Sequence, residues 1–290
     1  MSRPLWFLAA GMLVAFGPVS AAASGRPQGP LVYVSDDTSG VIDVFNSKAR
    51  KVRQIVGIDS PMGLLVDRDH NLWVANPRGN DVLVFRRGAA RPTHTLVDED
   101  EPNDVALCPD GTAYVADSGG RGGISVFPPG RTRRARRLEA QQNGAGGLEY
   151  FVTCDTSGNV FATGLVGPTP FYATTGWRGG KQAGYYLLPG GGQTVAGIKA
   201  TRSNTLLIST LQGSVPSVIE YTEAGKPTGR YITTGADVWS AIVFDENAGN
   251  VYGADSNYQQ VVSVKFPSGT VTRRYRNWNL LHPTGVAVDR

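Results

Sequence analysis

Short apolar segments separated by Gly, Asn, Asp and Pro recur along the chain at a nearly constant spacing. One pattern, an aromatic or apolar residue followed by small or branched residues and then a polar one, occurs six times. The copies are "VYVSD" (32–36), "LWVAN" (72–76), "AYVAD" (113–117), "VFATG" (160–164), "LLIST" (206–210) and "VYGAD" (251–255). Their landmark residues, Tyr33, Trp73, Tyr114, Phe161, Leu207 and Tyr252, lie 40, 41, 47, 46 and 45 residues apart. Such a period indicates repeated units that pack on their neighbours rather than separate domains.

Each repeat contains four short strands. An apolar strand precedes every copy except the first, as in "MGLLVD" and "SAIVFD", and a third strand follows after a turn, as in "GVIDVF" and "VVSVKF". A fourth, more polar strand comes next, for example "KVRQIVG" or "GRYITTG". Four strands joined by turn residues predict one antiparallel meander per repeat. Six meanders predict an all-β fold, a six-bladed β-propeller of four-stranded antiparallel blades.

The two ends of the repeat array complement each other. The first meander lacks its opening strand, whereas "PTGVAVDR" (283–290) is an opening strand without a meander. In a ring of sheets, residues 284–289 would pair beside residues 31–36 and complete one blade. Closure would remove the exposed sheet edges that invite aggregation. The alternative is a longer array that has been truncated, and we favour closure because the two halves match without remainder.

The first residues are typical of a secretory signal. An early Arg is followed by an apolar stretch from Leu5 to Phe16 and then by small residues. This divides the chain into a signal peptide (1–23) and a single propeller domain (24–290). No later segment is apolar for the roughly 18 residues that a spanning helix needs, and lipid attachment is not expected because the first cysteine is Cys108. We therefore expect a secreted or periplasmic monomer that is neither a lipoprotein nor a transmembrane protein.

The charge is modest, with 28 Lys and Arg against 24 Asp and Glu, but the basic residues are grouped. The groups are "SKARKVR" (47–53), "RTRRARR" (131–137) and "TRRYR" (272–276). All three fall at the third turn or fourth strand of a repeat, so we expect them on the outer rim of the ring. Such a belt could contact an anionic cell-envelope surface, or it could serve solubility and edge protection. Nucleic acid is not an expected partner of an exported protein.

The pattern "P-x-G-[apolar]-x-V-D", followed by "N-L-W-V-A-N" and "V-x-V-F", resembles the NHL-repeat and SMP-30/gluconolactonase-like six-bladed β-propellers. The resemblance covers essentially the whole chain after the signal. It implies that the opening strand of each blade lies nearest the central axis. The loops before the opening strands and those joining the second and third strands would then share one face. They would line a funnel, the usual ligand position in such folds.

The same resemblance provides a test for an enzyme. Gluconolactonase-like propellers hold a divalent metal through Asn or Asp just after the strand-opening Pro, together with a Glu from another blade. The corresponding positions here are Met62, Asn103, Tyr150, Ala196, Ser240 and Thr284, and only Asn103 matches. The alternative function is therefore a divergent metal-assisted hydrolase or lyase that uses Glu101, Asn103, Asp104, Glu149 and His282.

An acidic run, "VDEDEPND" (97–104), lies where the second repeat leads into the third. Carboxylates this dense can collect Ca²⁺, although the run lacks the alternation and central Gly of an EF-hand loop. A solvated acidic loop is the alternative. We expect no required cofactor, and Ca²⁺ is the one candidate ion, with Glu101, Asn103 and Asp104 as candidate metal ligands.

Four polar residues, Asp36, Asn76, Asp117 and Asp255, end the second strands of their repeats. Recurrence favours turn-making, because short Asx side chains accept backbone hydrogen bonds, while a polar ligand site is the alternative. His282 precedes the last strand and would face the funnel, without a recognisable nucleophile or orienting partner. The full set of candidate ligand-binding residues is Asp36, Asn76, Arg78, Glu101, Asn103, Asp104, Asp117, Glu149, Tyr150, Trp239, Asp255 and His282.

The two cysteines end the opening strands of consecutive repeats, so they should be neighbours in space. An oxidising compartment would permit a disulfide between them. Aligning the turns, however, makes Cys108 equivalent to Asp155, which offsets Cys154 by one residue and turns it to the other side of its strand. The sequence therefore favours two free cysteines and leaves the bond open.

No "GxSxG", "HExxH" or "GxxxxGK[ST]" pattern is present, which lowers the odds of the common hydrolase and nucleotide-binding classes. The scaffold pattern is intact while the metal-ligand pattern is largely unmatched. The leading hypothesis is a non-catalytic binding or interaction module for a small molecule, peptide or glycan at the central funnel.

Overall fold

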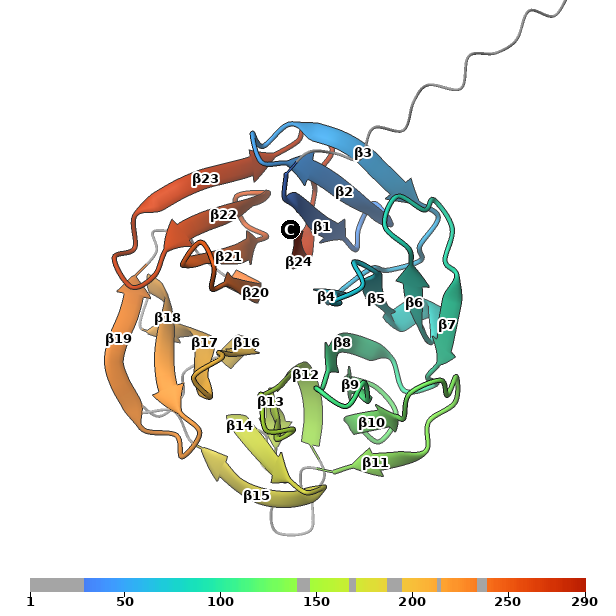
Figure 1. The fold of residues 1–290 in the computed structure, drawn as a ribbon, viewed down its shortest axis with the longest axis vertical. Helices are drawn as coiled ribbons and strands as arrows, with labels where there is room; N and C mark the ends of the chain where they lie inside the picture. The colour runs from blue at the N-terminus through green and yellow to red at the C-terminus, as the bar shows by residue number, and fades with distance from the viewer. Residues whose placement is uncertain (1–28, 140–146, 167–170, 187–194, 213–214, 234–238) are drawn as a thin grey trace, which may run out of the picture.

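The computed structural model of the protein describes residues 29–139, 147–166, 171–186, 195–212, 215–233 and 239–290. The predicted signal peptide lies outside these residues. The described residues form six four-stranded antiparallel sheets arranged in a ring, which confirms the predicted six-bladed β-propeller (Figure 1). Within these ranges, no helix is long and apolar enough to cross a membrane.

Each blade has one inner strand near the centre of the ring and three strands that follow it outward (Figure 1). From the inner strand outward, blade 1 contains β24 (Pro283–Asp289), β1 (Leu31–Asp36), β2 (Val41–Asn46) and β3 (Lys51–Val56). Blade 2 contains β4 (Leu64–Val66), β5 (Leu72–Asn76), β6 (Asp81–Phe85) and β7 (His94–Val97), with the 3₁₀ turn η1 (Pro77–Gly79) between β5 and β6. Blade 3 contains β8 (Pro102–Leu107), β9 (Ala113–Asp117), β10 (Gly123–Phe127) and β11 (Arg136–Leu138).

The remaining three blades follow the same order. Blade 4 contains β12 (Gly147–Cys154), β13 (Val160–Val166), β14 (Phe171–Arg178) and β15 (Lys181–Tyr186). Blade 5 contains β16 (Val195–Ala200), β17 (Thr205–Gln212), β18 (Val215–Thr222) and β19 (Pro227–Thr233). Blade 6 contains β20 (Trp239–Asp245), β21 (Asn250–Asp255), β22 (Gln260–Lys265) and β23 (Val271–Arg276).

Blade 1 is closed by the last strand of the chain. Strand β24 pairs antiparallel with β1, so that Tyr33 lies opposite Ala287 and Val34 opposite Val286. The predicted pairing of residues 284–289 with residues 31–36 is thus confirmed. The inner edge of β1 is covered by a strand more than two hundred residues away in sequence, and the ring has no break at that blade.

The hydrophobic core lies between the blades, and this explains why the second strands are apolar at nearly every position. In β1, Tyr33 belongs to the cluster that blade 1 shares with blade 2, whereas Val32 and Val34 belong to the cluster shared with blade 6. A strand that buries both faces needs apolar side chains on both. Each fully buried large side chain contributes about 1.5–3 kcal/mol, so the blades stabilise the ring mainly through their shared faces.

Hydroxyl groups add polar links between neighbouring blades. Ser35, Thr163 and Ser209 hold the same position in their repeats, one residue before the end of the "VYVSD"-type segment. Their hydroxyls donate to carbonyls in, or just before, the inner strand of the next blade, those of Met62 (2.6 Å), Ala196 (2.5 Å) and Trp239 (3.0 Å) respectively. In blades 2, 3 and 6 the same position is alanine. Side-chain hydroxyls therefore fix the register of the inner strands at three of the six blade junctions.

A disulfide joins blade 3 to blade 4, which corrects the expectation of two free cysteines. Cys108 and Cys154 are bonded, with their Cα atoms 5.2 Å apart. Alternation continues to Cys108, since Ala106 and Cys108 pack in the cluster that blades 3 and 4 share, while Leu107 between them packs in the cluster that blades 2 and 3 share. Cys154 packs against the cluster of blades 3 and 4 from the other side. Because adjacent blades meet through opposite faces of their sheets, the one-residue offset turns the two cysteines toward each other.

Candidate functional site

The loops before the inner strands and the turns joining the second and third strands lie on one face of the ring, here called the funnel face. Seven residues of blades 2 and 3 line a pocket of about 440 Å³ there, here called the funnel pocket. They are Ser60, Met62, Pro77, Arg78, Asn80, Glu101 and Asn103. Three of the predicted site residues, Arg78, Glu101 and Asn103, are thus brought together.

The two charged side chains of the funnel pocket are exposed and have no ion-pair partner among the described residues. Arg78 lies on the 3₁₀ turn η1, and Glu101 adopts a left-handed backbone conformation with φ of 56° just before β8. The carbonyl oxygen of Glu101 accepts a hydrogen bond from the Ser118 N–H, which holds the loop in place. The pocket therefore offers one free cation and one free anion beside the amide of Asn80 and the side chain of Met62.

The polar side chains at the metal-ligand positions of gluconolactonase-like propellers bond to neighbouring backbone. The Asn103 amide donates to the Tyr150 carbonyl (2.8 Å), and the Thr284 hydroxyl donates to the Pro61 carbonyl (3.1 Å). The Ser240 hydroxyl lies 3.4 Å from the Thr284 carbonyl. These groups tie adjacent inner strands to one another, so the donors that a metal cage would need have a structural use here.

Asp104 is buried among three inner strands. One of its oxygens accepts the Val152 N–H (3.1 Å), and the other lies where a side chain on Gly63 would stand. Only glycine at position 63 leaves room for this carboxyl, because an added Cβ would lie 2.2 Å from it. Burial raises the pKa of Asp104, and the positive charge of Lys199 only partly opposes this. Of the candidate metal ligands, Glu101 and Asn103 line the funnel pocket, whereas Asp104 is held by Val152 and enclosed at Gly63.

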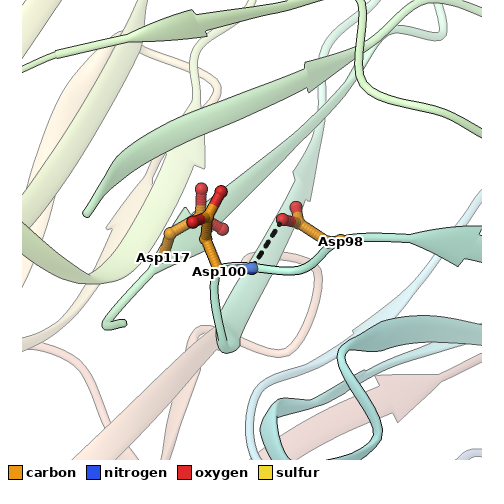
Figure 2. Close-up of side chains that lie close together, drawn as sticks. All are labelled: Asp98, Asp100 and Asp117. Carbon is orange, nitrogen blue, oxygen red and sulfur yellow. Dashed lines mark hydrogen bonds between the residues drawn. The ribbon is translucent and has the colours of Figure 1, made fainter. Parts of the chain in front are cut away.

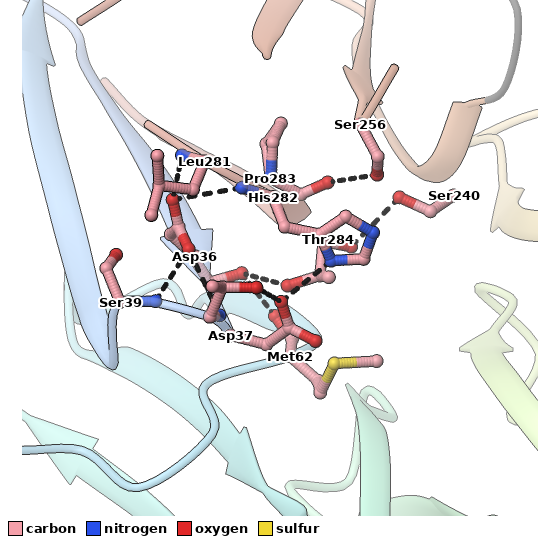
Figure 3. A network of polar contacts seen from close by, with 12 residues as sticks. Asp36, Asp37, Ser39, Met62, Ser240, Ser256, Leu281, His282, Pro283 and Thr284 are labelled. Atoms are coloured by element: carbon pink, nitrogen blue, oxygen red, sulfur yellow. Dashed lines mark hydrogen bonds and ion pairs between the residues drawn. The ribbon is translucent and has the colours of Figure 1, made fainter. Parts of the chain in front are cut away.

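Closure of blade 1 gives His282 a partner that the sequence did not reveal. Its Nδ1 lies 2.7 Å from Oδ1 of Asp37, and the histidine side chain is about half exposed (Figure 3). The pair is brought together by the pairing of β24 with β1. The predicted ring closure could have revealed this pair, since it places residues 36 and 37 beside residue 282.

The recurring Asx residues at the ends of second strands divide into two groups. Asp36 accepts the N–H groups of Thr38 and Ser39 within its turn and, through its second oxygen, those of Leu281 and His282 (Figure 3). Asp255 accepts the Tyr258 N–H (3.2 Å) and the Gln260 amide (2.8 Å), and Asn76 accepts the Ser60 N–H (3.0 Å). These three residues hold turns and loops in the way predicted.

Asp117 holds the same repeat position and does not hold its turn. Its Oδ2 accepts the Ser125 hydroxyl (2.6 Å), while its Oδ1 has no hydrogen-bond partner although the residue is fully buried. Burial, and then the negative charge of Asp98, raise the pKa of Asp117 to about 8. The glycine-rich turn that follows closes through a backbone bond from the Gly122 N–H to the Gly119 carbonyl, and the Gly119 N–H ties it to the Asp100 carbonyl of the neighbouring segment.

The three other predicted candidates lie between blades. Glu149 is fully buried on the face of blade 4 that turns to blade 3, and neither of its oxygens has a hydrogen-bond partner. Burial raises its pKa to about 8, with a small opposing effect from the Thr175 hydroxyl. The indole of Trp239 packs over Gly253. Tyr150 supplies the carbonyl that Asn103 binds, and burial raises the pKa of its phenol.

A second pocket, of about 450 Å³, lies on the opposite face at the far ends of the inner strands of blades 2 to 6. It is lined by Leu65, Trp73, Leu107 and Ala200, by the disulfide, and by charged turn residues that include Asp67, Arg68, Arg202 and Glu246. The sequence patterns gave no reason to expect it, because its polar lining consists of turn residues that recur in most repeats.

The basic groups lie on or near the outer strands, as predicted, but several of their side chains bond inward. Arg274 and Arg276 of β23 both donate to the Gln260 side chain, and Lys51 of β3 lies 2.7 Å from Asp43. Arg131 and Arg133, just before β11, are exposed. Part of the basic belt therefore serves packing within its own blade.

Comparison with known proteins identifies the architecture. No protein-family model matches the chain, and no curated protein sequence matches it. Among solved structures, it is similar to a chain of a nidogen/laminin complex (TM-score 0.68, 17% identity, 90% of this chain and 98% of that one). It is also similar to Kuenenia stuttgartiensis hydrazine synthase (TM-score 0.64, 14% identity, 94% and 93%).

A functionally unknown protein from Desulfotomaculum acetoxidans is a further match (TM-score 0.63, 10% identity, 89% and 98%). Likeness at identities this low shows the fold alone. The narrower resemblance to the NHL-repeat and SMP-30 groups therefore stays a prediction. What the coordinates and these matches establish together is that the chain is a six-bladed β-propeller.

Proposed function

We propose that the protein is a non-catalytic binding module that takes a small molecule, peptide or glycan in the funnel pocket. The observation that carries this proposal is the pair of unpaired charges in that pocket, Arg78 and Glu101, beside the polar groups of Ser60, Asn80 and Asn103. A ligand that carries both a carboxylate and an amino or hydroxyl group could bond to both side chains at once. Ligand sites typically combine such convergent polar groups with apolar surface, which Met62 and Pro77 supply.

The non-catalytic assignment follows from how the axial polar groups are used. Asn103 and Ser240 bond to inner-strand carbonyls, Thr284 bonds to the Pro61 carbonyl in the loop before β4, and Asp104 is buried against Val152. Moving any of them onto a metal or a substrate would leave a buried carbonyl or N–H without a partner, at a cost of roughly 1–3 kcal/mol each. The contacts of these groups therefore support a structural role for them rather than a catalytic one.

The proposal is tested with a fluorescently labelled protein on peptide and glycan arrays, followed by calorimetric titration of each hit. We expect Arg78→Ala and Glu101→Gln to weaken binding of a charged hit about tenfold or more, because each removes a charge-assisted hydrogen bond. Arg68→Ala is the matched control, since Arg68 is equally exposed but lines the pocket on the opposite face. Equal binding by wild type and both funnel variants would place the ligand elsewhere.

A metal-assisted hydrolase or lyase is the second candidate, and the His282–Asp37 pair is the observation that favours it. A carboxylate on one ring nitrogen orients a histidine for general-base work by the other. Turnover of lactones or aryl esters that is lost in both His282→Ala and Asn103→Ala would support this candidate. Turnover that survives in both variants, or none in the wild type, would count against it.

A further inference from the structure

We infer that Asp98, Asp100 and Asp117 form a Ca²⁺ site at the junction of blades 2 and 3, separate from the funnel pocket and from the candidate ligands Glu101, Asn103 and Asp104. Asp117 ends β9, and Asp98 and Asp100 lie on the segment that connects β7 to β8. Figure 2 shows the three carboxylates facing one another across this junction. One oxygen of each lies within 4.8 Å of the other two.

These separations fit one ion. Calcium binds oxygen at 2.3–2.6 Å, so two ligands of the same ion can lie up to about 5 Å apart. The donors are all oxygen atoms, which suits a hard cation and disfavours zinc and copper. The three carboxylates come from a turn and a connecting segment, so their arrangement is irregular. Ca²⁺ accepts irregular coordination, whereas Mg²⁺ requires a strict octahedron, and the site therefore suits Ca²⁺ better.

Two orphaned oxygens point independently to a missing partner. Oδ2 of Asp98 and Oδ1 of Asp117 have no hydrogen-bond partner, although the two residues are only 1% and 0% exposed. A buried carboxylate oxygen without a donor is costly, and native structures rarely leave one unexplained. The orphaned atoms belong to the two carboxylates that the chain itself leaves without a close ion pair.

The surrounding charges leave a negative excess at these two carboxylates. Asp100 is bound by the guanidinium groups of both Arg134 and Arg137. Asp98 has only Arg134, at 3.7 Å, and Asp117 receives only the Ser125 hydroxyl. Two positive groups therefore face three carboxylates, and both make their close ion pair with Asp100, while their other hydrogen bonds are with the Ser125 hydroxyl and the Gly122 carbonyl. A bound cation would balance Asp98 and Asp117.

The sequence repeat supports a special role for Asp117. Asp36 and Asp255 occupy the equivalent position, and each uses one oxygen on the N–H groups of its own turn and the other on groups outside it. The glycine-rich turn after Asp117 is instead closed by backbone hydrogen bonds. Asp100 is 15% exposed and lines a pocket of about 330 Å³ at the outer edge of blade 3, which gives an ion a route from solvent.

The experiment uses the full-length protein stripped with EDTA and titrated with Ca²⁺ by calorimetry and by thermal unfolding. We expect one ion per chain and a rise in Tm of roughly 5 °C at saturation. Mg²⁺ and Zn²⁺ are titrated in parallel and should bind at least about tenfold more weakly. No heat and no shift in Tm up to millimolar Ca²⁺, or tighter binding of Zn²⁺, would overturn the assignment.

Three variants locate the ion. Asp117→Asn and Asp98→Asn should each weaken Ca²⁺ binding about 100-fold, and both should fold without the ion because each removes a buried charge. Asp255→Asn is the matched control at the same repeat position in blade 6 and should retain the Ca²⁺ response even if its Tm is lower. An ion that still binds to Asp117→Asn but is lost in Asn103→Ala would lie at the axis, and the inference would be wrong.

Discussion

The turns after β1 and β9 come from nearly the same sequence, "VYVSD" and "AYVAD", and use their terminal aspartates in opposite ways. Asp36 accepts four N–H groups, two from its own turn and two from the segment that leads into β24. Asp117 accepts one hydroxyl and leaves one oxygen without a partner. Both residues are fully buried. The comparison teaches that a repeat fixes where a residue lies, while its non-repeating neighbours decide what that residue does.

The largest expected effect is that of Asp36→Ala. The variant leaves four backbone donors without their acceptor, and two of them belong to the segment that closes the ring. We expect the free energy of unfolding to fall by about 3–5 kcal/mol, measured by urea denaturation at pH 7. Asp36→Asn keeps one acceptor oxygen and should lose less. A loss below about 1 kcal/mol for the alanine variant would contradict the role given to Asp36 in closure.

Glu149 extends the comparison to a fully buried carboxyl that, among the described residues, faces no positive charge and only the Thr175 hydroxyl. Its folded-state pKa, raised by burial to about 8, lies above the ordinary value of 4.5. The folded state therefore binds more protons between these values, and its stability falls as pH rises through this window. Glu149→Gln should remove this dependence and be more stable than wild type at pH 9 by roughly 4 kcal/mol. Parallel stability curves of the two proteins from pH 5 to pH 9 would refute this.

In the absence of Ca²⁺, Asp117→Asn should raise the free energy of unfolding, whereas Asp36→Ala should lower it. Replacing the carboxyl by an amide removes a charge that Asp98 repels and that burial disfavours. We expect a gain of about 1–2 kcal/mol at pH 8 in EDTA, measured by urea denaturation. A destabilised variant would mean that Asp117 supports its turn as Asp36 does, and the contrast between the two turns would disappear.

Ser35→Ala should produce the smallest effect. The hydroxyl donates to the Met62 carbonyl (2.6 Å) between blades 1 and 2, and alanine already occupies this repeat position in three blades. We expect a loss of about 1 kcal/mol, read as a decrease in Tm of a few degrees. Its matched control is Ala254→Ser in blade 6, which should not gain stability to the same extent.

The architecture could be predicted because its causes are local and repeated. The spacing of the landmark residues fixes six units, and the unmatched strand at 284–289 can complete only the blade that lacks one. Both signals depend on apolar alternation and turn residues, which a single sequence displays directly.

The candidate site was harder to predict because its contacts join segments that no pattern links. Asp37 and His282 meet only because the ring closes. Cys108 and Cys154 meet because adjacent blades contact each other through opposite faces of their sheets, which an alignment of single repeats does not display. Asp117 and Asp36 look alike in sequence, and only the glycine-rich loop after Asp117 and the distant Asp98 distinguish them. Because an Asx residue recurs at the same position in four repeats, the sequence predicted one role for all four. The contacts of Asp117 show that the same residue at the same repeat position can form different hydrogen bonds.

The pairing of β24 with β1 also constrains how the molecule can be assembled during synthesis. Blades 2 to 6 can form in the order in which they are synthesised, yet strands β1 to β3 cannot complete blade 1 until β24 is available. Until then the inner edge of β1 stays open to pairing with another chain, which is the stage at which association between nascent chains is most probable. The step that closes the ring therefore joins two segments more than two hundred residues apart in the chain.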